Sequence, residues 1–365
     1  MSCSGESMQD GEAAILLQGL RRLEQLGISK PVVGECLSSW SYRINLQING
    51  PIFDHPKYVS DARGIVQSDA PDSSGIRFVD PDGVASNDWV DNCVQTLDIP
   101  RQWFECQFPF FERPYTPLRY RRAFCYQCLA QSMQATGLPA WKSDWRHLAQ
   151  PMCSVHAVPL LDAPVSFALT LDHPARAFTW YWDSLHAKEH YKRICNAWPL
   201  RNAFAFDVQR RIDALREKAT DHVERAQIEG FILSLMRAVM MPCLHYAFPK
   251  VVFSDWGGPN VYRRDAFYLN FYQEIYRASS IARVSALYLC GLLLGWITEE
   301  EGNSTNSEGY FTPARAWVIW ELMEEHFNLL TLLGDELRHY ESISLNISLL
   351  ADIPRSRCAA NTPSE

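Results

Sequence analysis

The stretch that decides the fold begins with Cys125-Tyr126-Gln127-Cys128 and ends with Cys153-Ser154-Val155-His156. Two positions separate the metal-binding residues of each pair, so both side chains of one tight turn can face the same ion. Three thiolates and one imidazole are a common tetrahedral ligand set for structural Zn²⁺. We therefore expect these two pairs to bind one structural zinc ion. The spacing also leaves open the alternative that the thiols are reduced core residues without a metal.

Several segments around these pairs carry further information. Arg121-Arg122-Ala123-Phe124 precedes the first pair, and Leu129-Ala130 follows it. Trp141-Lys142-Ser143-Asp144-Trp145-Arg146 lies between the pairs, and Gly34-Glu35-Cys36-Leu37-Ser38-Ser39-Trp40-Ser41-Tyr42-Arg43 lies upstream. Taken in this order, the segments resemble the TniQ family of transposition target-selection proteins. The resemblance covers about residues 30 to 165 and departs from the family pattern at Cys36 and Ser41.

The resemblance implies a mainly α fold. Its expected N-terminal region is helix-turn-helix-like, with an inserted zinc-knuckle subdomain, and an α-helical C-terminal domain follows. The expected ranges are 1–30 for a tail and helix, 31–165 for the TniQ-like domain with its knuckle at 125–156, 166–350 for the helical domain and 351–365 for a disordered tail. A chain of 365 residues with 47% hydrophobic residues can bury cores for two such domains.

Apolar periodicity and capping residues predict the individual helices. They are expected at 11–26, from Ser38 or Ser39 onward, and at 87–97, 101–108, 178–198, 203–240 (one helix or two), 268–298 and 313–330. Residues 50–87 are expected to form an irregular loop with a short strand at 76–79, and 299–307 a second loop. The pair 87–97 and 101–108 is a helix-turn-helix candidate, although such corners are also common in helical folds without DNA contact.

For a TniQ-like protein, the expected function is that of a non-enzymatic adaptor in DNA transposition. Such a protein links target-site recognition, through DNA or an RNA-guided complex, to an AAA+ ATPase regulator. The resemblance also admits a homodimer and implies no membrane partner. An alternative that the sequence does not separate from this one is a TniQ-like scaffold in another mobile-element or defence system.

Basic and aromatic residues are concentrated before and within the zinc-knuckle segment, although the formal net charge of the chain is −8. Dedicated nucleic-acid binders are usually basic, so we expect any DNA contact to be local or shared with a partner. The candidate residues for contacting nucleic acid or a partner are Arg113, Arg119, Arg121, Arg122, Lys142 and Arg146. The alternative is that the aromatic residues of 108–120 brace the subdomain and the arginines are solvated.

The run His186-Ala187-Lys188-Glu189-His190 fits the inverted zincin pattern H-x-x-E-H, which would suit a catalytic metal. This short pattern lacks an identifiable third ligand, and an exposed helix face is the competing interpretation. The sequence also contains no Gly-rich phosphate-binding loop and no Gly-x-Ser-x-Gly motif. A metalloenzyme is therefore kept only as an alternative, and we expect no catalytic residues.

Cysteine usage and the first residues bear on the compartment. The chain has 11 cysteines, and residues 1–12 are polar and acidic rather than apolar like a secretory signal. We therefore expect a cytoplasmic protein whose thiols are free or metal-bound. The most apolar run, 284–297, is shorter than the ~20 residues that span a bilayer, and we expect it to be a buried helix.

Overall fold

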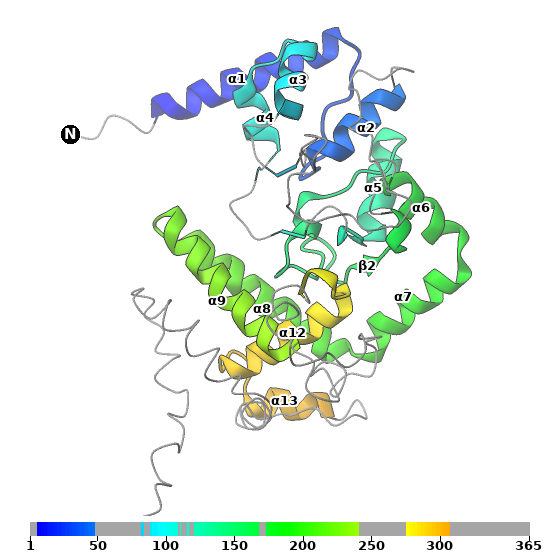
Figure 1. Ribbon diagram of the computed structural model, residues 1–365, viewed down its shortest axis with the longest axis vertical. Helices are drawn as coiled ribbons and strands as arrows, with labels where there is room; N and C mark the ends of the chain where they lie inside the picture. The colour runs from blue at the N-terminus through cyan, green and yellow to red at the C-terminus, as the bar shows by residue number, and fades with distance from the viewer. Residues whose placement is uncertain are drawn as a thin grey trace, which may run out of the picture. The chain divides into compact units, whose positions relative to one another are not determined.

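The computed structural model describes residues 6–47, 82–83, 88–108, 110, 115–116, 120–167, 173–240 and 275–306 (Figure 1). Among these residues the protein is mainly helical, which confirms the mainly α part of the expected fold class. The expected loop and strand within 50–81, the helix at 313–330 and the C-terminal tail lie outside the described residues. No helix in the described part of the chain is long and apolar enough to cross a bilayer.

The chain divides into two compact units. The first comprises Met1–His147 and Leu161–Glu189, and the second comprises Leu148–Leu160 and His190–Glu365. The domain ranges expected from the sequence, with a boundary at 165, stay predictions.

Among the described residues, the N-terminal part of the first unit contains the helices α1 (Glu6–Gln25), α2 (Leu37–Gln47), α3 (Asp88–Leu97) and α4 (Arg101–Gln107). Trp40 of α2 packs against Trp103 and Phe104 of α4, with ring centroids 5.8 and 6.2 Å apart. The helix α1 lies against α4 because Gly19 leaves room for the indole of Trp103. All three aromatic side chains are completely buried, so α2 and α4 share one aromatic core.

The rest of the first unit surrounds a two-stranded antiparallel sheet. The strand β1 (Ala123–Phe124) pairs with β2 (Leu161–Asp162), with Ala123 opposite Asp162 and Phe124 opposite Leu161. The helix α5 (Tyr126–Thr136) follows β1, and α6 (His173–Asp183) packs against α5. Two 3₁₀ helices, η2 (Ser143–Arg146) and η3 (Val165–Phe167), complete this part.

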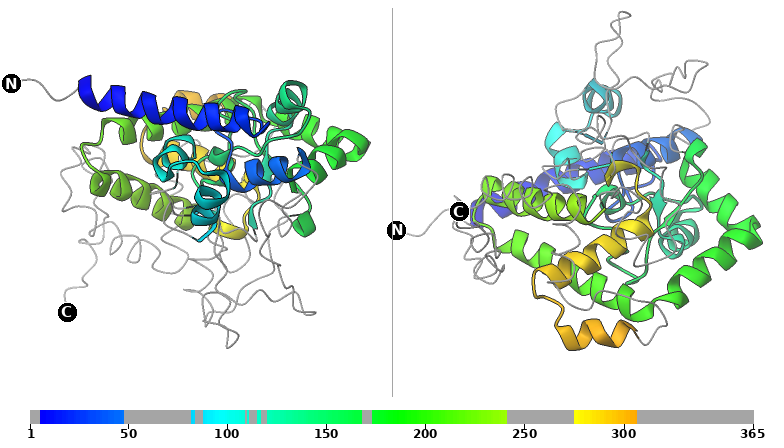
Figure 2. Two further views of the ribbon diagram at one scale, coloured as in Figure 1. Left: turned by 90° about the horizontal axis from the view of Figure 1, so that it is seen from above. Right: turned by 60° about the horizontal axis from the view of Figure 1, so that its bottom comes forward.

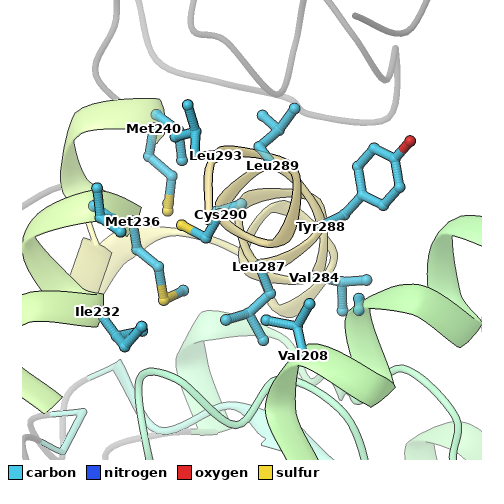
Figure 3. Packing of buried hydrophobic residues seen from close by; sticks show 14 of the residues in the cluster. Val208, Ile232, Met236, Met240, Val284, Leu287, Tyr288, Leu289, Cys290 and Leu293 are labelled. Carbon is cyan, nitrogen blue, oxygen red and sulfur yellow. The ribbon is translucent and has the colours of Figure 1, made fainter. Parts of the chain in front are cut away.

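The second unit is built around one buried helix, α12 (Ser280–Leu293). It packs against α8 (Pro199–Lys218) and α9 (His222–Met240), which lie beside each other (Figure 2). Every residue of α12 is buried, so the expected buried helix at 284–297 is confirmed for 284–293, while residues 294–297 lie beyond the end of the helix. In Figure 3, Leu287 points toward Val208 of α8, while Cys290 faces Met236 and Met240 of α9.

Three expectations for local structure are wrong. In the described part of the predicted helix at 268–298, the helix α12 begins at Ser280, because Ser279 accepts a hydrogen bond from Ala282 N, and it ends at Leu293. The predicted helix at 178–198 is two helices, α6 and α7 (Leu185–Ala197), because Ser184 accepts a hydrogen bond from Ala187 N and begins a new helix. The predicted loop at 299–307 contains α13 (Glu299–Asn306). There Thr298 and Glu301 form a capping box, in which Thr298 Oγ1 accepts from Glu301 N and Glu301 accepts from Thr298 N at 2.8 Å.

Candidate metal centre

The structure brings Cys125, Cys128, Cys153 and His156 together. Their ligand atoms all lie within 4.8 Å of one another, and the three thiols are buried while the imidazole is half-buried. This group could hold a metal ion, and its three sulfurs and one ring nitrogen are compatible with zinc.

The first pair is positioned by the start of α5. Cys125 immediately precedes the helix in an extended conformation, and Cys128 lies in the first turn. Leu129 N donates to Cys125 O at 3.1 Å, which closes that turn. Residues three apart on a helix lie on the same face, so the two thiols point to one place.

The second pair lies in a closed turn. Cys153 N donates to Val158 O at 2.8 Å, and Ala157 N donates to Cys153 O at 2.9 Å. Ala157 adopts a φ of 52°, in the left-handed region that L-residues other than glycine rarely occupy. These bonds curl the backbone back on itself between the two residues, so that Cys153 and His156 face each other.

One distance tests whether the second pair fits a tetrahedral ion. Cys153 Sγ and His156 Nδ1 are 3.5 Å apart. Zn–S bonds of about 2.3 Å and Zn–N bonds of about 2.0–2.1 Å at a tetrahedral angle place the two ligand atoms about 3.6 Å apart. The donor set therefore fits, and Nδ1 is the ring nitrogen that faces the group.

Other described cysteines differ from this group in their surroundings. Burial raises the pKa of the Cys36 and Cys93 thiols to about 12, and it raises the pKa of Cys290 further. These thiols stay protonated at neutral pH and behave as small core residues. Only the four residues at 125–156 combine several ligand side chains in one place among the described residues.

A buried ion pair lies beside α2 in the upstream segment. Arg43 donates to both oxygens of Glu35, from Nε and Nη2 at 2.8 Å each, and both side chains are almost completely buried. Glu35 Oε1 also accepts from Ser39 Oγ at 2.9 Å. Glu35 has no role among the sequence-based expectations, because the spacing of eight residues from Glu35 to Arg43 is not a recognisable helix pairing.

The upstream segment and the segment between the metal-binding pairs form one hydrogen-bonded assembly. Cys36 N donates to Trp141 O at 3.0 Å, and Trp141 N donates to Ser39 Oγ at 2.9 Å. Ser143 N donates to Gly34 O at 2.8 Å. The segments Gly34–Arg43 and Trp141–Arg146 both belong to the family resemblance, and their bonded residues Ser39 and Trp141 are 102 positions apart in the sequence. They lie side by side within the first unit.

Two of the six predicted basic contact residues are buried. Arg121 and Arg146 are 4% and 2% exposed, and both form ion pairs with the Asp82 carboxylate at 3.0 and 3.4 Å. Asp82 Oδ1 also accepts from Ser38 N, and Oδ2 accepts from Ser38 Oγ. Burial raises the pKa of Asp82, but Arg146, Arg121 and Ser38 outweigh it and hold the pKa below its ordinary value.

The remaining predicted contact residues are distributed differently. Arg122 is half-buried, and Lys142, also half-buried, donates to the carbonyl of Val33. Arg113 and Arg119 lie outside the described residues. A role of these residues in binding nucleic acid or a partner stays a prediction, and within the described part of the chain it would depend on Arg122 and Lys142.

The inverted zincin pattern does not gather ligand atoms. His186 is exposed on α7, and the Nδ1 atom of His190 lies 3.1 Å from Nη2 of Arg193. Among the described residues, the residues of this pattern belong to no group of three or more candidate ligands. The exposed helix face is thus the better interpretation of this run.

No family model, no curated protein and no solved structure matches this chain. The resemblance to the TniQ family rests on the sequence segments quoted above.

Proposed function

We propose that this protein is a zinc-binding, TniQ-like adaptor without catalytic activity. It would connect recognition of a transposition target site to an AAA+ regulator. Two observations carry the proposal: the four predicted ligands converge, and hydrogen bonds join Trp141 and Ser143 to the docked segment Gly34–Arg43. Both stretches of the resemblance thus take part in one local structure, as a shared family fold would require.

The proposed metal role is structural. Three thiolates and an imidazole complete a tetrahedral shell, which leaves no open position for a substrate. When bound, zinc would supply a rigid cross-link between the two turns, while Cys125, Cys128, Cys153 and His156 hold it. This favours a scaffold over the metalloenzyme alternative.

Metal content tests this part of the proposal. We expect one zinc per chain by elemental analysis, lost in Cys125→Ser and kept in Cys106→Ser, a matched change at an exposed cysteine. His186→Ala should also keep the metal. Loss of the ion in His186→Ala with retention in Cys125→Ser would contradict the assignment of the site.

The proposed helix-turn-helix-like region contains α3 and α4. Its exposed side chains indicate whether it would contact DNA directly or through a partner. Gln102 and Glu105 on α4 are exposed, and Arg101 is paired with Asp91 of α3. A recognition helix usually presents cations and amides to the phosphates and bases. The mixed, partly acidic surface of this corner therefore supports recognition through a partner more than direct reading of bases.

The adaptor role is tested by binding between purified proteins. We expect the full chain to co-elute with the AAA+ ATPase encoded in the same element, in the presence of ATP and DNA. Duplex DNA alone should bind weakly, with a salt dependence that flattens in Arg122→Ala and Lys142→Ala but not in an exposed control such as Arg210→Ala. Absence of any complex with the ATPase under these conditions would argue against the adaptor role.

A further inference from the structure

A path of buried hydrogen bonds starts on the helix that carries Cys128. Ser132 lies one turn after Cys128 in α5 and is 3% exposed. Its hydroxyl donates to Leu129 O at 2.8 Å and accepts from Ala140 N at 2.8 Å. Ser132 therefore ties the chain after α5 to the first turns of that helix.

The same path continues to α2. Trp141, the residue after Ala140, donates from its backbone N to Ser39 Oγ at 2.9 Å. Ser39 donates in turn to Glu35 Oε1 at 2.9 Å, and Glu35 holds Arg43. Ser39 and Glu35 have no exposed surface, and Arg43 is 1% exposed. We call this series, from Ser132 through Trp141 and Ser39 to Glu35, the Ser132–Ser39 path.

Because the hydrogen bonds of the path are buried, breaking one of them costs more free energy than breaking an exposed one. A buried donor or acceptor that loses its partner costs about 1–3 kcal/mol, because water does not replace the lost bond. Each serine hydroxyl in the path both donates and accepts, so a shift of α5 affects the bonds on both sides. Through this series of bonds, a more ordered α5 can therefore stabilise the position of α2.

The start of the path depends on the metal-binding residues. The helix α5 has only 11 residues, and helices this short are marginal without help from the rest of the fold. Cys125 and Cys128 flank its first turn, and Ser132 bonds to Leu129 O within the next. Holding the two thiols on one ion fixes the first turn, and with it the position of Ser132.

We infer that helix α2 is under metal control: metal bound at Cys125 and Cys128 stabilises the segment Gly34–Arg43 through the Ser132–Ser39 path. The inference rests on the metal site of the proposed function. It makes the docked segment a conformational switch, ordered in the loaded protein and loosened when the metal is removed. Any partner that contacts α2 would then bind in a metal-dependent way.

Hydrogen exchange of the full chain, zinc-loaded and chelated, tests the inference. Peptides from α5 and from residues 35–43 should both exchange faster after chelation, by about tenfold for each lost buried hydrogen bond. Peptides from α12, whose buried core contains none of these residues, should exchange at an unchanged rate and serve as the internal control.

Two variants cut the path and one matched variant leaves it intact. In Ser39→Ala and Ser132→Ala, exchange at 35–43 should become insensitive to chelation, while α5 still responds. Ser38→Ala removes a neighbouring buried hydroxyl that bonds Asp82 rather than the path, so its metal response should equal that of the wild type. If Ser39→Ala loses protection throughout α3 and α4, the neighbouring helices of its own unit, and thus fails to fold, the result of Ser132→Ala decides.

The possible results separate this inference from the proposed function. Stoichiometric zinc with a response confined to α5 overturns the inference and leaves the metal site standing. A full wild-type response at 35–43 in Ser39→Ala or Ser132→Ala also overturns it. A chain that binds no zinc contradicts both proposals together.

Discussion

Asp82 illustrates what single residues contribute to the polar interior of the first unit. Its carboxylate faces two arginines and the start of α2, although it is 44 positions from Ser38. In the sequence it stands in a Pro-, Gly- and Asp-rich stretch that reads as an irregular loop. No local pattern distinguishes it from the other acidic residues of this stretch, because its partners come together only in the folded chain.

Replacing Asp82 with Asn should destabilise the protein at neutral pH. Arg121 and Arg146 would be left buried with less negative charge, and breaking a buried pair typically costs about 3–5 kcal/mol. Chemical denaturation at pH 7 measures the difference. The control is Asp207→Asn, since Asp207 is exposed and pairs weakly with Arg210.

The pH dependence of this difference follows from the lowered pKa of Asp82. A carboxyl whose folded pKa lies below its ordinary 3.8 adds stability above that value and loses it as the pH falls through the folded pKa. The gap between wild type and Asp82→Asn should therefore be full at pH 7 and shrink below about pH 4. A gap that stays constant down to pH 3 would contradict the ion-pair account.

The tautomer of His156 is a second prediction at this scale. Because Nδ1 faces Cys153 Sγ at 3.5 Å, we expect this nitrogen to bind the metal and Nε2 to carry the proton. Long-range ¹H–¹⁵N correlation spectra of the zinc-loaded protein distinguish the two nitrogens. A metal-shifted Nε2 with a protonated Nδ1 would show that the ring is oriented the other way.

At the scale of elements, much of the helical pattern could be predicted from the sequence. Apolar periodicity located α1 to α4 and the buried α12, since these helices each bury one clear face or all of it. The break between α6 and α7 and the helix α13 were missed. Both depend on caps, at Ser184 and at Thr298 with Glu301, which are short polar signals inside longer runs.

The close packing of α1 on α4 predicts a cost for Gly19→Ala. A Cβ on Gly19 would lie 2.1 Å from Trp103 Cδ1, and the indole is completely buried. Overpacking costs about 1–3 kcal/mol, which exceeds the roughly 1 kcal/mol that alanine gains over glycine in a helix. Denaturant unfolding should show net destabilisation, whereas the exposed neighbour Gln18→Ala should be neutral or slightly stabilising.

In the turn that contains Cys153 and His156, we expect a substitution by glycine to stabilise the protein. Ala157 has a φ of 52°, so Ala157→Gly should relieve about 1 kcal/mol of backbone strain. Ala203→Gly, in the exposed part of α8, should instead destabilise by about 1 kcal/mol. Thermal unfolding of the two variants tests the contrast, and equal losses in both would show that Ala157 is not strained.

At the scale of the whole molecule, the candidate site was more predictable than its surroundings. The four ligands could be predicted from the sequence, because a separation of two residues within each pair lets both side chains reach one metal ion. The burial of two predicted basic contact residues was not predictable, since residue type does not reveal that Arg121 and Arg146 turn inward to Asp82. A net charge of −8 agrees with this inward use of cations and with the proposed bridging role.

The proposed function depends on three thiolates and one imidazole forming a single closed metal site. Zinc K-edge X-ray absorption of the purified full chain tests it most directly. We expect one zinc per chain with three sulfur ligands at about 2.3 Å and one nitrogen ligand at about 2.0–2.1 Å. A chain without bound zinc, or a zinc shell dominated by oxygen ligands, would contradict it.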